Sequence, residues 1–169
     1  MEIKTQHLIL KPISDSDRAA IGDILKDEKV KQTYIVPDFK SEDEVDKVFQ
    51  SYKRLSLAEE KICVGVFLKT DESRLIGIVH ETDRAEKSLE LGWAFNSNYH
   101  NKGYATEAVL AVIPQAFSLG FCEVVAGAFS ENPASIRVME KCGMSRIEKT
   151  EEIDYRGKIH TCVFYSIKR

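Results

Sequence analysis

The sequence predicts an α/β fold, more closely an α+β fold, in which a mixed central β-sheet is flanked by helices in the order β-α-α-β-β-β-α-β-α-β-β. Two observations predict it. Apolar residues recur at helical spacing in some segments, whereas other segments are runs rich in β-branched and aromatic residues. Three of these strand-like runs follow one another with short polar connections, which favours an antiparallel meander.

The first strand and the first two helices are predicted from alternation and from capping residues. Residues 8–13 alternate as an edge strand does. A capping box, in which a serine is followed three residues later by an acidic residue, opens one helix at Ser14 and another at Ser41. The first helix runs toward Lys26, and the second ends near Glu60.

The meander and a third helix follow. Strands are expected over residues 62–68, 75–80 and 89–95, which are separated by polar, turn-like stretches. From residue 103 to residue 119 the apolar residues return to helical spacing, and Gly120 ends that helix.

The last third of the chain predicts a strand, a short helix and a hairpin. The strand covers residues 124–129, and the helix covers residues 133–142 with Gly143 as its left-handed stop. Residues 144–153 and 159–167 form the two hairpin strands, joined by a good hairpin connection.

Composition limits the class of protein. The chain has 169 residues without an internal repeat or a linker-like segment, so we expect a single domain over residues 1–169. A formal net charge of −3 disfavours a large nucleic-acid footprint, and no direct nucleic-acid partner is expected. We expect no membrane span, because no run of about 18 apolar residues occurs. The first residues lack a charged leader followed by an apolar stretch, so we expect a cytoplasmic location.

The cysteines do not point to a disulfide framework or to a metal. The four are far apart and lie in apolar segments, which predicts reduced thiols in the core. His160 and Cys162 share one strand face, but no other ligand pair is near them in the sequence. No metal is therefore expected.

The most informative segment, residues 96–108, joins a predicted strand directly to a predicted helix. Gly103 allows unusual backbone angles and close approach of a ligand, and the free N–H groups of a helix start favour an anion such as a pyrophosphate. The segment does not follow the ATP-binding G-x-x-x-x-G-K-[ST] pattern, and no G-x-G-x-x-G occurs. The alternative is an ordinary strand–loop–helix junction in which Gly103 is only a turn residue.

Two blocks of this chain resemble the GNAT superfamily of N-acetyltransferases. Its acyl-coenzyme A signature, R/Q-x-x-G-x-G/A at a strand-to-helix junction, is matched in part by HNKGYA at residues 100–105. The second block, NPASIRVMEKCGM at residues 132–144, resembles the N-x-x-S…E-K-x-G-F segment of the branch that acetylates N-terminal amines of ribosomal proteins (RimJ/RimL-type). The resemblance covers nearly the whole chain.

The resemblance implies an acetyl-CoA-dependent N-acetyltransferase, an acyltransferase that moves an acetyl group to a primary amine by direct attack in a ternary complex. Acetyl-CoA would be the co-substrate, with no metal. The implied cofactor-binding residues are Ala94, Phe95, His100, Asn101, Lys102, Gly103, Tyr104, Ala105, Thr106, Asn132 and Ser135. A backbone N–H near Ala94 or Phe95 would polarise the thioester.

The sequence departs from the family pattern at three positions. His100 stands where the family has Arg or Gln, and Asn101 stands where Gly is common. Met139 stands where many members have the tyrosine that reprotonates the departing thiolate, and a thioether has no proton to donate. Ser135 is the expected substitute acid, acting directly or through water, with a helix-cap role as the alternative.

The general base is expected at Glu90, which would remove the ammonium proton through water, with His80 and Glu81 in reserve. A solvated residue on the outer face is the alternative for Glu90. The segment from Ser14 to Glu60 and the last hairpin are expected to set acceptor specificity, with Tyr34, Phe39, Tyr155 and His160 among the residues involved.

The expected partner is an amine acceptor, either a protein N-terminus or a small molecule, and a homodimer stays open. A second class of function also stays open, a non-catalytic acyl-CoA-binding or sensor module with the same fold. His100 and the missing tyrosine motivate it.

Overall fold

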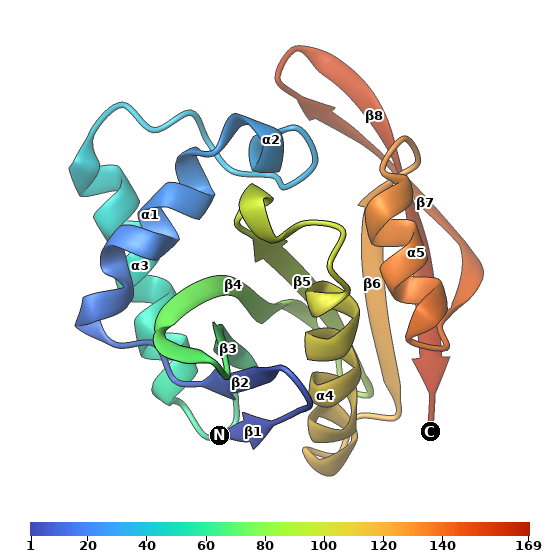
Figure 1. Ribbon diagram of the computed structural model, residues 1–169. Helices are drawn as coiled ribbons and strands as arrows, with labels where there is room; N and C mark the ends of the chain where they lie inside the picture. The colour runs from blue at the N-terminus through green and yellow to red at the C-terminus, as the bar shows by residue number, and fades with distance from the viewer.

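The computed structural model describes all residues from 1 to 169, which form eight strands in one sheet and five α-helices. Figure 1 shows how these elements are arranged. The strands are β1 (Ile3–Lys4), β2 (Leu8–Lys11), β3 (Cys63–Leu68), β4 (Asp71–Arg84), β5 (Ser88–Phe95), β6 (Glu123–Phe129), β7 (Ser145–Tyr155) and β8 (Lys158–Lys168). The helices are α1 (Arg18–Lys26), α2 (Glu28–Lys31), α3 (Glu42–Leu57), α4 (Tyr104–Ser118) and α5 (Pro133–Lys141). Single 3-10 turns lie at Asp15–Asp17 and Ser97–Tyr99.

The strand order across the sheet is β1-β2-β3-β4-β5-β6-β8-β7. This mixed sheet flanked by helices confirms the predicted fold class, and β3, β4 and β5 form the predicted antiparallel meander. The sequence prediction missed β1 and the short helix α2. It was also wrong to make residues 8–13 an edge strand, because β2 pairs with β1 on one side and with β3 on the other.

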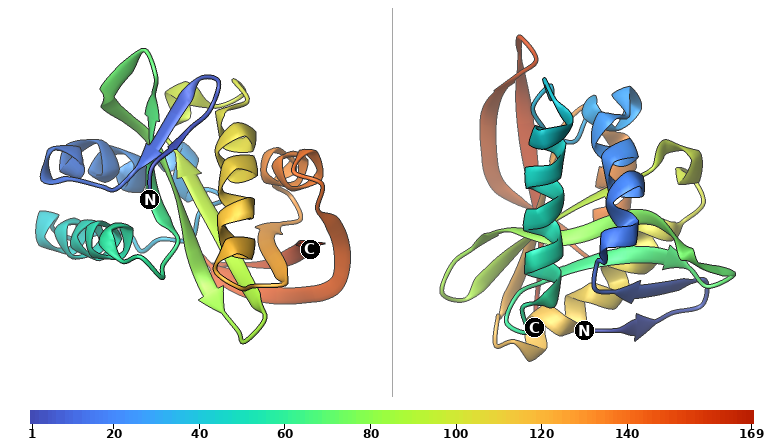
Figure 2. Two further views of the ribbon diagram at one scale, coloured as in Figure 1. Left: turned by 90° about the horizontal axis from the view of Figure 1, so that it is seen from below. Right: turned by 90° about the vertical axis from the view of Figure 1, so that its left-hand side faces the viewer.

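The helices cover both faces of the sheet, with α1 and α3 on one side and α4 and α5 on the other (Figure 2). The predicted helical faces are the buried ones. Ala108, Val109 and Val112 of α4 lie in a core cluster with no exposed surface. Ile21 of α1 and Phe49 of α3 lie in a second cluster on the opposite face of the sheet. The apolar spacing read from the sequence therefore shows which side of each helix packs on the sheet.

The helix starts form as their capping residues predict. Ser14 and Asp17 make the reciprocal capping box, and the Ser41 hydroxyl accepts a hydrogen bond from the N–H of Glu44 over 3.4 Å. Gly103 precedes α4 with a φ of 83°, in the left-handed region that glycine enters without a steric penalty. None of the helices is both long and apolar enough to cross a membrane.

All four cysteines are free, and three of them are core thiols. Burial raises the pKa of Cys63 and of Cys142 to about 12 and that of Cys162 to about 11. Cys122 is exposed, so the expectation of four core thiols is wrong there. It lies one residue before β6, where the chain is still on the surface.

The sheet opens between β5 and β6. They are the parallel pair of the sheet and stay in register over three residue pairs, from Ser88 opposite Glu123 to Glu90 opposite Val125. Beyond that point β5 remains paired with β4 as far as Phe95, and β6 remains paired with β8 as far as Phe129. The two strands therefore diverge, and their facing edges are left unpaired.

The β7–β8 hairpin is tied to the segment that follows α2. The Tyr155 hydroxyl lies 2.8 Å from the carbonyl oxygen of Lys31 and 3.2 Å from those of Tyr34 and Val36. Next to it, the Arg156 guanidinium donates to the Glu28 carboxylate over 2.9 Å. These contacts hold residues 31–36 in place although they belong to no strand or long helix.

We expect Tyr155→Phe to lower the free energy of unfolding by about 1–2 kcal/mol, because three buried or half-buried carbonyl groups lose their only hydroxyl donor. Urea titration followed by circular dichroism measures this. Tyr165→Phe is the matched control, since Tyr165 is about as buried, at 8% against 9% exposed, and makes no hydroxyl hydrogen bond within the chain. An equal loss of unfolding free energy in the two variants would show that the Tyr155 hydroxyl does not stabilise this segment.

Candidate active site

A cavity of about 630 Å³ lies where the N-terminal ends of α4 and α5 face the end of β5. Residues from the segment around α2 complete its wall. Its lining residues are Lys29, Val30, Thr33, Tyr34, Trp93, Ala94, Phe95, Tyr99, His100, Asn101, Gly103, Tyr104, Ala105, Thr106, Asn132, Pro133, Ala134, Ser135, Arg137, Val138 and Lys141. We call it the first cavity.

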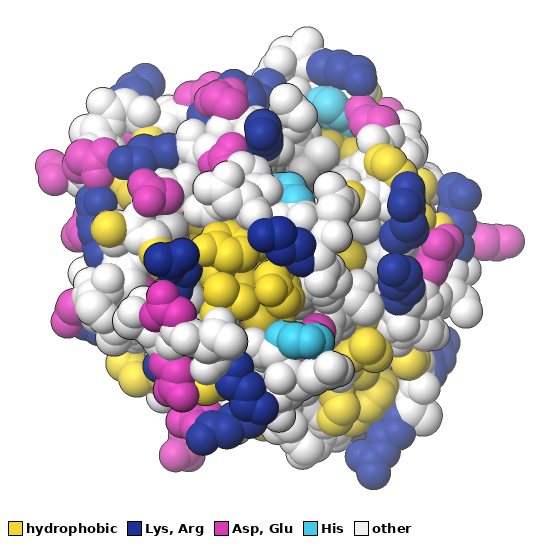
Figure 3. Space-filling model, in the orientation of Figure 1, with side chains coloured by type: hydrophobic (Ala, Val, Ile, Leu, Met, Phe, Trp, Pro, Cys, Tyr) yellow, Lys and Arg dark blue, Asp and Glu magenta, His cyan; other side chains and the backbone are white.

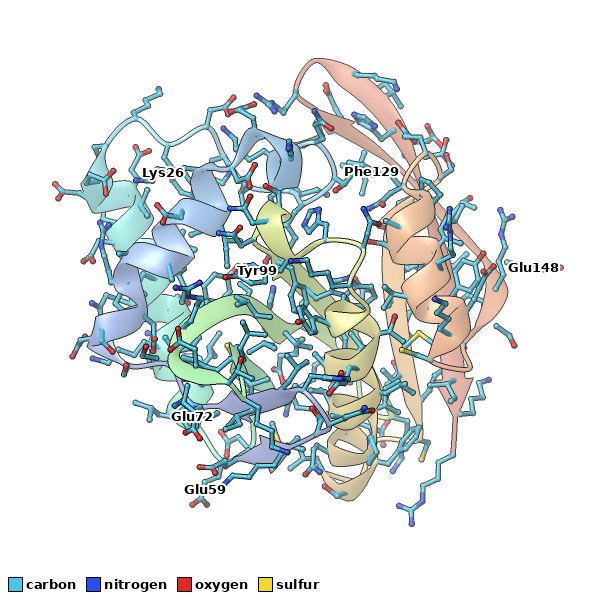
Figure 4. All side chains as sticks on the ribbon, viewed as in Figure 1. Lys26, Glu59, Glu72, Tyr99, Phe129 and Glu148 are labelled. Atoms are coloured by element: carbon cyan, nitrogen blue, oxygen red, sulfur yellow. The ribbon has the colours of Figure 1, made fainter.

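A second cavity of about 340 Å³ adjoins it, and residues of both β5 and β6 contribute to its wall. Its lining residues are Thr33, Tyr34, Ile35, Tyr52, His80, Thr82, Glu90, Leu91, Gly92, Trp93, Gly127, Ala128, Phe129, Asn132, Ser135, Glu151, Ile153, Cys162 and Phe164. In Figure 4 the labelled Phe129 lies at the end of β6 beside the β7–β8 hairpin. Five residues line both cavities, namely Thr33, Tyr34, Trp93, Asn132 and Ser135.

The loop before α4 presents a row of free backbone donors to the first cavity. Asn101 and Gly103 both have positive φ, 59° and 83°, which turns the chain sharply into the helix. The backbone N–H groups from Asn101 to Thr106 have no acceptor within the chain, and the first helical bond is donated by Glu107 to the Gly103 carbonyl. Consecutive free N–H groups at the positive end of a helix dipole form an anion site.

The charged side chains divide between the two cavities. Those in the first cavity are all cationic, Lys29 on α2 with Arg137 and Lys141 on α5, and Figure 3 shows basic side chains gathered over α5. Those in the second cavity are carboxylates, Glu90 and Glu151. An anionic ligand in one cavity and a cationic ligand in the other would each meet opposite charge.

Sequence reasoning missed these three cations. The signal was available for two of them, because Arg137 and Lys141 are four residues apart and so share one face of α5. For Lys29 no local signal existed, because its place depends on how residues 28–36 fold back over the end of β5.

The structure brings together all but one of the predicted cofactor-binding residues. Ten of the eleven line the first cavity. The exception is Lys102, whose ammonium lies 5.3 Å from the centre of the Tyr99 ring and outside the cavity lining. His100 lies at the rim, and its Nε2 donates to the Phe95 carbonyl oxygen over 2.8 Å, which fixes the end of β5.

Asn132 and Ser135 form a reciprocal pair at the start of α5. The Asn132 side-chain oxygen accepts from the Ser135 N–H over 3.2 Å, and its amide nitrogen donates to the Ser135 hydroxyl oxygen over 3.0 Å. Ser135 therefore takes part in the cap, as the alternative interpretation expects. Because its oxygen acts as the acceptor, its hydroxyl hydrogen remains free to donate where the two cavities meet.

Met139 is fully buried in the core cluster under α4 and lines neither cavity. The Met139 side chain packs with the core and does not reach either cavity.

Glu90, the predicted base, lines the second cavity with a quarter of its side chain exposed. Its carboxylate accepts from the Thr82 hydroxyl over 3.0 Å and lies 3.9 Å from the Lys149 ammonium. Of the two reserves, His80 lines the same cavity. Glu81 lines neither cavity, and its carboxylate is held by Lys61 and Arg84 at 3.0 and 2.7 Å.

Of the four residues expected to set acceptor specificity, one lines the cavities and three do not. Tyr34 lines both cavities, whereas Phe39 packs against the core cluster under α1 and α3. Tyr155 and His160 line neither cavity. Tyr155 holds the backbone of the wall, and the His160 ring stacks on Phe129 with 4.3 Å between ring centres.

A buried chain of hydrogen bonds runs along one wall of the second cavity. His80 Nδ1 lies 2.9 Å from the Glu81 carbonyl oxygen, which can only accept, so Nδ1 carries the proton. His80 Nε2 then accepts from the Tyr34 hydroxyl over 2.6 Å, and the Tyr34 oxygen accepts from the Tyr52 hydroxyl over 2.7 Å. Burial lowers the pKa of His80 and raises the pKa of Tyr34 and Tyr52, so the three groups are neutral together.

Comparison with known proteins identifies the family. Residues 7–145 match the family described as Acetyltransferase (GNAT) domain. The uncharacterized N-acetyltransferase YnaD of Bacillus subtilis (strain 168) is 34% identical over 148 residues, which is 86% of this chain and 84% of that protein. The chain therefore belongs to the GNAT acetyltransferase family, and it is an N-acetyltransferase.

Solved structures share its fold. A GNAT-family acetyltransferase from Bacillus anthracis has a TM-score of 0.85 at 27% identity, with 99% of this chain and 98% of that chain covered. RimL, a ribosomal L7/L12 alpha-N-protein acetyltransferase solved in complex with coenzyme A, also has a TM-score of 0.85, at 17% identity and with the same coverage. The likeness to RimL is one of fold.

We expect His80 to make the protein less stable in weak acid. Its folded-state pKa lies below the ordinary value of 6.5, so below that pH the unfolded chain binds a proton that the folded chain refuses. Stability is then lost as pH falls from about 6.5 toward the lowered pKa. Comparing urea unfolding at about pH 7.5 and about pH 5.5, His80→Gln should lose less stability than the wild-type protein. An equal loss of stability in the wild type and in His80→Gln would show that His80 has the same pKa in the folded and unfolded states.

Proposed function

We propose that the protein transfers the acetyl group of acetyl-CoA to a primary amine, either a protein N-terminal α-amine or a small-molecule amine, by direct attack in a ternary complex. The division of charge between two connected cavities is the observation that supports it most. A cofactor with several phosphates suits the cationic first cavity, and a protonated amine suits the second cavity with its two carboxylates. The two ligands would meet at the opening between β5 and β6.

The residues of the first cavity fit coenzyme A. Free N–H groups from Asn101 to Thr106 can bind a pyrophosphate, and Arg137 and Lys141 supply charge for a further phosphate. Lys102 would take part through its backbone alone. The unpaired edges of β5 and β6 can hold an extended amide-containing arm by backbone hydrogen bonds, with Ala94 and Phe95 beside the thioester. His100 keeps the end of β5 in place instead of binding phosphate directly.

The remaining residues would handle the amine and the departing thiol. Glu90 and Glu151 attract the ammonium, and Glu90 receives its proton through water, which leaves a neutral amine to attack. As the carbon–sulfur bond breaks, the Ser135 hydroxyl donates to the sulfur in place of the tyrosine that Met139 replaces. The rigid reciprocal pair with Asn132 holds that hydroxyl where the cavities meet.

The phosphate site is tested by Gly103→Asp, which places bulk and negative charge among the free N–H groups. Calorimetric titration with acetyl-CoA should show binding to the wild-type protein that weakens at least about 100-fold, the size of about 2.7 kcal/mol, in this variant. Gly120→Asp is the matched control. Both glycines have positive φ, 83° and 96°, with nothing within 4 Å of an added Cβ, but Gly120 follows the opposite end of α4. Equal weakening in both variants would contradict the site.

The role of the second cavity in binding the amine is tested by Glu90→Gln, which removes the negative charge of the side chain and keeps its shape. With benzylamine, tyramine, spermidine and an alanyl tripeptide as acceptors, kcat/KM should fall about 100-fold for each amine that the wild type acetylates. Glu152→Gln is the matched control, because Glu152 is exposed on β7 and lies outside both cavities, and it should leave kcat/KM unchanged. If the wild-type protein binds acetyl-CoA but acetylates no amine over a wider panel, the protein is a sensor and the proposal is wrong.

A further inference from the structure

We propose that Tyr34 and His80 form a proton relay that takes the second proton from the acceptor nitrogen while acetyl transfer occurs. The inference rests on the proposed function. Tyr34 would be a catalytic residue that touches the reacting nitrogen, and His80 would act through it. Neither residue belongs to the two sequence blocks that resemble the family signature.

The position of Tyr34 is the first argument. It is one of five residues that line both cavities, so its side chain lies at the junction where an amine and a thioester would meet. Glu90 lines the second cavity alone, which places it beside an incoming ammonium. The Tyr155 hydroxyl holds the backbone on both sides of this position, at the carbonyls of Lys31, Tyr34 and Val36. The wall that carries Tyr34 is thus fixed before any ligand binds.

The direction of the hydrogen bonds is the second argument. The Glu81 carbonyl keeps the proton of His80 on Nδ1, so Nε2 offers a lone pair to the Tyr34 hydroxyl at 2.6 Å. Tyr34 already donates its proton along this bond and accepts one hydrogen bond from Tyr52. One lone pair of the Tyr34 oxygen remains, and a nitrogen in the cavity can donate to it.

The proton balance of acetyl transfer is the third argument. Glu90 removes one proton from the ammonium before attack, but the nitrogen becomes positive again when the carbon–nitrogen bond forms. It must then lose a second proton. That proton passes to the Tyr34 oxygen while the Tyr34 proton passes to His80 Nε2, and the electron pair of the N–H bond stays on nitrogen. The carbon–sulfur electron pair leaves with sulfur, which takes a proton from Ser135.

The relay closes without another reactant. His80 returns its proton through Tyr34 to water in the cavity, and Ser135 regains a proton from the same water. Glu90 releases the first proton to the same water, so the net reaction is ammonium plus thioester giving amide, thiol and one proton. Burial keeps His80 unprotonated in the resting protein, as a proton acceptor must be.

Other titratable groups face His80 from each packed element. They are Tyr34 after α2, Tyr52 on α3, Cys63 opposite it on β3, and the adjacent Glu81, with Glu90 across the cavity on β5. Glu81 is held by Lys61 and Arg84, and burial raises the pKa of Cys63 to about 12. His80 is the imidazole of this set, and its Nε2 is the atom bonded to the Tyr34 hydroxyl, so it is the group placed to take a proton from Tyr34.

Steady-state kinetics test the relay, with the acceptor from the panel above that the wild type acetylates fastest. Tyr34→Phe and His80→Gln should each lower kcat about 100-fold, with the KM for acetyl-CoA changed by no more than about threefold. His160→Gln is the matched control, because both histidines are 9% exposed and His160 lines neither cavity. It should keep wild-type kcat.

The pH profile separates a proton acceptor from a residue that only shapes the wall. In the wild type, kcat should fall as the pH drops through the lowered pKa of His80, which lies below the ordinary value of 6.5, and this limb should be absent from His80→Gln. Tyr34→Phe serves as the second variant if His80→Gln does not fold. The inference is overturned if Tyr34→Phe keeps kcat within about threefold of the control, or if a folded His80→Gln keeps the limb. A wild type without turnover would instead contradict the proposed function.

Discussion

The site depends on one constraint, the divergence of β5 from β6. Three residue pairs join the strands, and each strand then follows its outer neighbour, β5 with β4 and β6 with β8. Because a sheet edge left unpaired exposes backbone donors and acceptors, the opening is polar along its length. It also connects the two faces of the sheet. Without it, the N-terminal ends of α4 and α5 would face a closed sheet and the two cavities would not meet.

Around that opening, three separate parts of the chain supply different chemistry. The loop before α4 supplies backbone N–H groups, α5 supplies cations and the Asn132–Ser135 pair, and the segment after α2 supplies Tyr34. The segment after α2 has little regular structure, and the hydroxyl of Tyr155 from the hairpin holds it. The position of Tyr34 in the site therefore depends on the hydrogen bonds that Tyr155 makes.

Local signals in the sequence predicted most of the fold and the loop that carries the proposed anion site. Ser14 and Ser41 cap helices through contacts within four residues, and Gly103 precedes a helix in the left-handed conformation that its type allows. β1 was missed because two residues carry no periodic signal. Because β1 was missed, β2 was predicted as an edge strand, although it pairs with β1 on its outer side.

The acceptor side of the site was less predictable, for a physical reason. Tyr34 is hydrogen-bonded to Tyr52, which is 18 positions away in the sequence, and to His80, which is 46 positions away. These residues become neighbours only when α3 and the segment after α2 pack over β4. No spacing rule predicts such contacts. Met139, which the sequence shows only as a departure from the family's tyrosine, lies fully buried in the core.

The central claim is that the free N–H groups before α4, at the mouth of the β5–β6 opening, are the phosphate site. Amide hydrogen exchange of residues 101–106, measured with and without acetyl-CoA, tests it most directly. These amides have no acceptor in the free protein, so they should exchange fast and become protected when phosphate oxygens accept from them. If saturating acetyl-CoA leaves their exchange unchanged while protecting other segments, the cofactor binds elsewhere and this account of the site is wrong.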